Sequence, residues 1–159
     1  MPSASDRLAQ LLGVLQPSLA MYLSDSGIGT YPGPEEIRRG LAELVADQRN
    51  VMDRAVLILE EREVAVSKVG YPISFSAWHD VDLRHVLPKV VAGLQEQWPA
   101  LERLSAVTDD AAAAGLAAEV LKSTRRHVDL LGQIATKLKA GLSARLSPAA
   151  VAAATPAAS

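Results

Sequence analysis

The sequence predicts an all-α protein in which four amphipathic helices form an antiparallel bundle. Hydrophobic residues make up 49% of the chain and aromatic residues only 4%. Much of the apolar content is Ala and Leu, which favour helices. Apolar residues also recur every three or four positions in four long segments separated by loop or capping residues. Four such helices can bury their apolar stripes against one another.

The first two helices flank the glycine-rich stretch SDSGIGTYPGP. The first predicted helix carries its apolar stripe at Leu8, Leu11, Leu12, Leu15, Leu19 and Tyr22. The second is expected to begin at Pro34, since a proline in the first turn loses no hydrogen bond. Its pattern runs to about Lys68, before Gly70 and Pro72 end it.

The third helix is expected after the loop GYPISFSAW, with Asp80 as its N-terminal cap and Asp82 in its first turn. Its stripe consists of Leu83, Leu87, Val90, Val91, Leu94, Trp98 and Leu101. The fourth helix is expected to begin at Thr108, whose hydroxyl can cap it, and to close near Gly141. Its stripe consists of Leu116, Val120, Thr124, His127, Leu131, Ile134 and Leu138.

Three prolines test this scheme. Pro17, Pro88 and Pro99 fall inside predicted helices, where a proline removes a backbone hydrogen bond at a cost of about 3 kcal/mol. On a helical wheel each proline lies on the side away from its apolar stripe. Long helices bend with their convex face toward solvent, where carbonyls can bond water. We therefore expect bent helices rather than broken ones.

The chain has the size of one domain, and we expect a single four-helix-bundle domain over residues 1–145. Residues 146–159 are rich in Ala and Pro, whose small side chains bury too little area to order a segment. A disordered tail is predicted there.

Composition argues against several classes of function. A net charge of −2 gives no general attraction for phosphate backbones or anionic lipid, so neither nucleic acid nor membrane is expected as a partner. The absence of cysteine excludes disulfides, iron–sulfur clusters and thiol catalysis. No segment approaches 18 uncharged apolar residues, and the N-terminus does not read as a signal peptide. A soluble, cytoplasmic protein is expected.

Two histidines and two aspartates crowd into the stretch HDVDLRH at residues 79–85. Capping explains the two aspartates without any chemistry. If the helix begins earlier, His79, Asp82 and His85 fall at three-residue steps on one face, which suits zinc or a similar ion. Because His85 points away from the apolar stripe, such a metal would lie at the surface or at a subunit interface. Capping is the favoured interpretation.

His127 is the second candidate, since it lies in the middle of an apolar stripe. Gln48 holds a similar inward position, and Tyr22 and Gln97 lie near the inner faces of the other two helices. A buried imidazole needs such hydrogen-bond partners. A polar layer that fixes helix register is favoured, and His127 as a metal or cofactor ligand is the alternative.

The helix plan over about residues 5 to 142 resembles the ferritin-like superfamily, with four long helices and a break in the middle. That resemblance implies a metal-binding or metal-storage function with a divalent ion, Fe or Zn. Di-iron members place Glu and Glu-x-x-His inward. No Glu-x-x-His occurs here, and the nearest match, Asp82-x-x-His85, lies on the outer side.

Catalytic signatures are incomplete, with no dinucleotide or Walker loop and no nucleophile elbow. We therefore expect a non-catalytic protein that acts through protein–protein contacts or self-assembly, as a homo-oligomer or with a protein partner, and without a cofactor. Enzymatic activity stays open but is not favoured. Candidate contact residues are the apolar side chains Leu57, Val64, Tyr71, Phe75 and Trp78.

Overall fold

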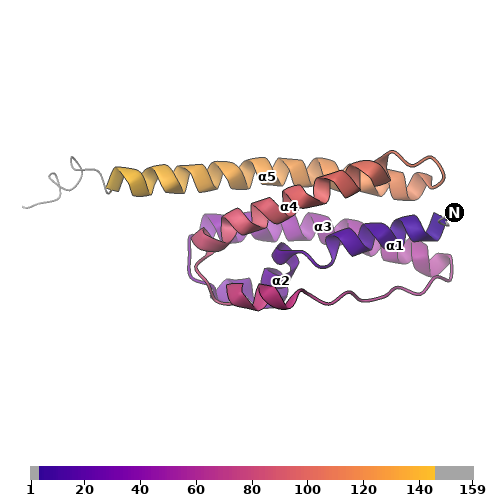
Figure 1. Cartoon of the computed structure of the whole chain (residues 1–159), viewed down its shortest axis with the longest axis horizontal. Coiled ribbons are helices and arrows are strands. Elements are labelled where there is room, and N and C mark those ends of the chain that lie inside the picture. The colour runs from indigo at the N-terminus through magenta and orange to yellow at the C-terminus, as the bar shows by residue number, and fades with distance from the viewer. Residues whose placement is uncertain (1–3, 146–159) are drawn as a thin grey trace, which may run out of the picture.

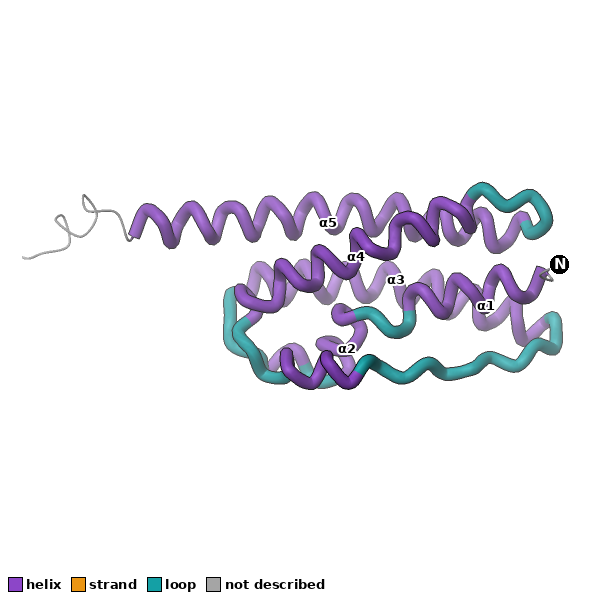
Figure 2. The backbone as a smooth tube through the Cα atoms, in the orientation of Figure 1, coloured by secondary structure: helices purple, strands orange, loops and turns teal. Residues whose placement is uncertain are grey.

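The computed structural model describes residues 4–145, with side-chain environments for residues 7–141, and within this range the chain is helical with no strand. The all-α prediction is confirmed, while the predicted tail at 146–159 lies outside the described residues. The helices are α1 (Ala4–Leu15), α2 (Leu19–Asp25), η1 (Ile28–Thr30), α3 (Glu35–Glu61), η2 (Ile73–Trp78), α4 (Leu83–Ser105) and α5 (Ala111–Arg145), where η marks a short 3₁₀ helix (Figure 2).

Helices α4 and α5 form the most extensive pair, α3 packs along α5, and α1 lies against α3 and α4 (Figure 1). Two hydrogen-bonded contacts fix the helix directions. The Leu83 amide at the start of α4 donates to the Pro32 carbonyl, just before α3, at 2.8 Å. At the other end Arg62, just after α3, bonds Asp110, just before α5. Helices α3 and α4 therefore run parallel, whereas the four most extensively packed pairs, α4/α5, α3/α5, α1/α3 and α1/α4, run antiparallel as predicted.

The parallel arrangement follows from a long connection that crosses back along the bundle between α3 and α4 (Figure 2). The predicted helix to Lys68 is wrong because α3 ends at Glu61. Glu63 adopts a left-handed φ of 58°, and the Val64 amide donates to the Leu59 carbonyl at 2.9 Å. This hydrogen bond belongs to the Schellman pattern that closes helices.

Beyond this closure, alternate residues hold the connection against the bundle. Val64 and Val66 pack on the apolar core beside α1, while Ala65 and Ser67 between and after them are exposed. A period of two belongs to extended backbone. The sequence VAVS therefore lies as an extended strap.

Pro17 breaks the first predicted helix, so the expectation of a bent helix is wrong there. Helix α1 ends at Leu15, and Ser18 caps α2 by accepting the Met21 amide at 3.2 Å. A new cap lowers the cost of ending one helix and starting another. Pro88 and Pro99, by contrast, lie inside α4 on its exposed side, as predicted.

The predicted caps of α4 and α5 are each two residues early. Asp82, not Asp80, caps α4 by accepting the Arg84 amide at 2.9 Å, and Asp80 holds a left-handed φ of 57° in the turn before it. Asp110, not Thr108, accepts the Ala113 amide at 3.1 Å at the start of α5. In both places the helix begins after the last of several possible caps.

Two apolar cores lie end to end along the bundle. One joins α2, the first halves of α3 and α4, and the later part of α5; the other joins α1, the second halves of α3 and α4, and the first part of α5. Between them sit three buried polar side chains, Gln48, Gln97 and Thr124. Within residues 4–145, no helix combines the length and apolar character that a membrane crossing requires.

Gly33 is required where the chain enters α3. Its φ of 138° is rarely open to other residues, and a Cβ there would stand 2.8 Å from the Leu83 Cβ. We expect Gly33→Ala to lower the free energy of unfolding by about 1–3 kcal/mol. Urea denaturation measures this. Gly13→Ala, at an open position of α1, should instead stabilise by up to ~1 kcal/mol; equal effects of the two substitutions would contradict the assignment.

Asp110 combines a cap with a buried ion pair. Burial alone would raise the pKa of this carboxyl, but hydrogen bonds from Arg62 and from backbone amides lower the pKa overall. The stabilisation is therefore complete above the unfolded pKa of about 3.9 and is lost as pH falls through the lower folded value.

Asp110→Asn should retain the cap, because Asn caps as well as Asp, while removing the charge that pairs with Arg62. We expect it to destabilise at pH 7 by roughly 1–3 kcal/mol. The difference from wild type should shrink below about pH 4. Melting curves from pH 2 to pH 7 test this, and a penalty independent of pH would refute the ion pair.

Candidate functional site

The stretch HDVDLRH does not assemble its predicted metal ligands in one place. The Asp82 carboxylate is bonded to the amide and guanidinium of Arg84, and the hydrogen bond to the guanidinium lowers the pKa of Asp82 to about 2. His85 is exposed on the first turn of α4, as predicted. No group of three His, Asp or Glu side chains in the described range is arranged to hold a metal ion.

His79 instead contacts a buried tyrosine. Its Nδ1 lies 3.4 Å from the hydroxyl of Tyr31, and its Nε2 lies 3.3 Å from a carboxylate oxygen of Asp80. Tyr31 is only 1% exposed, and its hydroxyl also lies 2.7 Å from the Ser26 hydroxyl. This polar chain fixes the η1 turn against the start of α4. Sequence periodicity could not find Tyr31, because it lies outside any helical stripe.

The expected polar layer exists, with a membership different from the one predicted. The Gln48 amide donates to Oε1 of Gln97 and to Oγ1 of Thr124, each at 3.2 Å. The Gln97 amide donates to the Val14 carbonyl at 3.3 Å. The layer therefore touches α1, α3, α4 and α5. Tyr22 does not join it and packs instead in an aromatic cluster with Tyr71 and Phe75.

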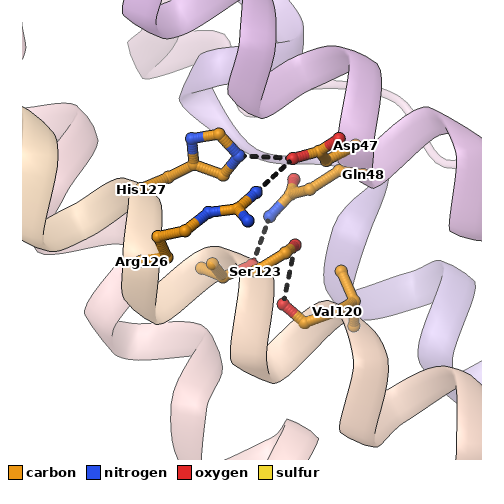
Figure 3. Close-up of polar contacts among 7 residues, drawn as sticks. Asp47, Gln48, Val120, Ser123, Arg126 and His127 are labelled. Atoms are coloured by element: carbon orange, nitrogen blue, oxygen red, sulfur yellow. Dashed lines mark hydrogen bonds and ion pairs between the residues drawn. The ribbon is translucent and has the colours of Figure 1, made fainter.

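His127 makes a separate contact about one turn from this layer. Its Nε2 lies 2.5 Å from Oδ2 of Asp47, and the Arg126 guanidinium donates to the same oxygen at 3.1 Å (Figure 3). The imidazole is 4% exposed, while Arg126 is exposed. A carboxylate in this position orients the ring and joins α3 to α5. Asp47 was missed because it lies at the edge of the buried stripe of α3, next to Gln48.

The chemistry available at His127 is limited. A His–Asp pair can act as a general base when a reacting group lies within hydrogen-bond reach. As a metal site it would supply one imidazole and one carboxylate, fewer than the three protein ligands usual for catalytic zinc. The pair is better described as a charge-assisted hydrogen bond between two helices.

A groove of about 540 Å³ lies beside His127, between α3 and α5. Leu130, Leu131 and Ile134 form its apolar side on α5. Three glutamates of α3 also line it, at positions 35, 36 and 43, with Arg39 and Lys137. Leu130 is 46% exposed. The α5 side of the groove combines these aliphatic residues with polar ones, and the α3 side is mainly acidic.

Gly40 of α3 lines this groove and packs closely against Leu131 of α5. A Cβ on Gly40 would stand 3.0 Å from the Cδ2 atom of Leu131, so a side chain there would require Leu131 to shift. On the opposite side of α5, a second groove of about 690 Å³ runs along α4, lined in part by Val91, Val128 and Thr136. The later part of α5 is therefore flanked by open grooves on both sides.

The end of α5 also projects past its neighbours (Figure 1). Helix α5 has 35 residues, against 27 in α3 and 23 in α4. Because α5 starts level with the end of α3, its far end reaches about 12 Å beyond the start of α3, at about 1.5 Å per residue. Two turns of α5 are left without a covering helix from the described part of the chain.

Comparisons with known proteins identify no family. No protein-family model, no curated protein and no solved structure matches the chain.

Two substitutions distinguish the buried contact of Asp47 with His127 from its exposed ion pair with Arg126. We expect Asp47→Leu to reduce the free energy of unfolding by about 1–3 kcal/mol, because it leaves the buried imidazole unpaired. Arg126→Gln removes only an exposed ion pair and should cost less than about 1 kcal/mol. Chemical denaturation of both variants measures the difference. A larger loss in Arg126→Gln than in Asp47→Leu would show that the ion pair, rather than the imidazole contact, joins the helices.

Proposed function

We propose that this protein is a non-catalytic helical bundle that assembles with a second copy of itself through the later part of α5. The observation that carries the proposal is the combination of exposed Leu130, the open groove beside it and the uncovered end of α5. An exposed leucine alone is ordinary on a protein surface. An exposed leucine on a helix that extends beyond the helices packed against it supports a contact surface.

Charge favours a second copy as the partner. Lys137 and Lys139 lie on the exposed side of the later part of α5. The α3 side of the groove carries three glutamates, at positions 35, 36 and 43, against one arginine, Arg39. Lys137 already lies 3.9 Å from Glu36 within one chain. In a two-fold arrangement each copy would offer its basic helix end and receive the other in its acidic groove.

Size sets a requirement on this interface. A stable dimer commonly buries about 800 Å² on each partner, which one leucine cannot supply. The contact must therefore extend along the groove and the projecting turns, and include Ile134 and Leu138, which are partly buried. Two antiparallel α5 helices would bring these side chains together.

A ferritin-like plan is the second interpretation of the fold. One long crossover joins α3 to α4, and ferritin-like bundles also contain one long crossover. Metal storage in such a plan would draw on inward carboxylates. The observed pairing of Asp47 with His127 and of Asp82 with Arg84 supports structural roles for these groups instead.

Light scattering coupled to size exclusion tests the assembly. We expect wild-type protein to form dimers as its concentration is raised to about 100 μM. Leu130→Asp should shift the population to monomer, because it places a charge in the interface. Leu57→Asp is the matched control, since Leu57 is 58% exposed on α3 and lines neither groove beside α5. Monomeric wild-type protein at every concentration would overturn the proposal, as would equal dissociation by the control.

A further inference from the structure

A third groove lies on another side of the molecule, where α1 gives way to α2 and η2 folds against α4. It encloses about 490 Å³, within the range of ligand pockets of roughly 300–1,000 Å³. Its walls are mainly apolar: Val14, Leu19, Phe75, Trp78, Val90 and Leu94 line it. These residues come from four separate segments of the chain.

The break at Pro17 helps to form this groove. A continuous helix would carry the chain straight past α4, but the chain leaves the helical path at Pro17 and Ser18, which both line the groove. On the α4 side Gly93 lines it with no side chain. A Cβ built on Gly93 meets no atom within 4 Å, so open space lies where a larger residue would reach.

The outer wall of the groove is held in place by its own contacts. Phe75 packs against Tyr22 and Tyr71 with ring centroids 5.9 and 6.4 Å away. The Tyr71 hydroxyl donates a hydrogen bond to Asp25. Burial, and to a smaller extent this hydrogen bond, raises the pKa of Tyr71 to about 12. Asp25 also pairs with Arg49 of α3 at 2.6 Å. The η2 wall is therefore anchored to α2 and α3 before any ligand arrives.

Charge gives the groove a direction. The Lys89 ammonium lies 6.0 Å from the centre of the Trp78 ring, and Glu96 lines the groove seven residues along α4. Seven residues of helix place the two charges about 10 Å apart along the axis. An anionic group is attracted at the Lys89 end and repelled at the Glu96 end. Gln97, beside Glu96, donates its side-chain amide hydrogen to the Val14 carbonyl.

We propose that this groove binds an amphipathic small molecule with an apolar chain and an anionic head group, such as an aliphatic carboxylate, with the head group beside Lys89. The apolar chain lies against Leu94 and Gly93, between α4 and the ring of Trp78. This site is separate from the assembly surface on α5, so either proposal can fail without the other.

Calorimetric titration with decanoate, below its micelle concentration, tests the site, with decanol as the neutral probe. We expect saturable binding of decanoate. Gly93→Leu should weaken it by at least about tenfold by filling the groove, and Gly115→Leu, at an equally open glycine on α5, should leave it unchanged. Lys89→Gln should weaken the binding of decanoate by about fivefold and leave the binding of decanol unchanged.

Fluorescence locates the bound probe, because the chain has only two tryptophans. Decanoate should change the emission of the Trp98→Phe variant, which retains Trp78 in the groove, and leave the emission of Trp78→Phe unchanged. Circular dichroism checks that each variant is folded. If Gly93→Leu fails to fold, Lys89→Gln and the fluorescence pair still decide the matter. Absence of saturable binding, undiminished binding by folded Gly93→Leu, or equal affinity of decanoate and decanol would overturn the proposal.

Discussion

The buried side-chain amide of Gln48 is the contact on which the arrangement of the bundle depends. Through Gln97 and Thr124, and through the carbonyl of Val14, it connects α1, α3, α4 and α5 at one level. Apolar burial is not directional, whereas a buried amide without a partner costs about 1–3 kcal/mol. A shift of any helix by one turn, about 5.4 Å, would break this layer. The layer thus selects one register and separates the two apolar cores.

The same layer accommodates the broken first helix. In a continuous helix the Val14 carbonyl would accept the amide of Ser18, and the break at Pro17 removes that donor. Gln97 supplies a replacement from α4. Because this carbonyl is satisfied, α2 can turn away from the axis of α1 and leave room for the groove beside Gly93. A core contact and a surface cavity therefore have one structural origin.

The crossover between α3 and α4 determines which surfaces remain open. Because these helices run parallel, α5 returns along both of them and spans both cores. Its greater length then carries it past the start of α3, where no other helix within residues 4–145 accompanies it (Figure 1). The pair of Asp47 and His127 holds α5 to α3 just before the flanking grooves open. The proposed assembly through α5 would cover the exposed side of this helix.

Periodicity and local backbone chemistry are enough to predict the helical class, the buried faces, the exposed positions of Pro88 and Pro99 within one helix and the outward position of His85. The sequence also indicated an inward His127, but not its partner Asp47. Contacts between distant segments set that pairing, the break at Pro17 and the parallel course of α3 and α4. Periodicity states which face of a helix is buried, whereas the neighbour that covers the face depends on how segments far apart in the chain meet.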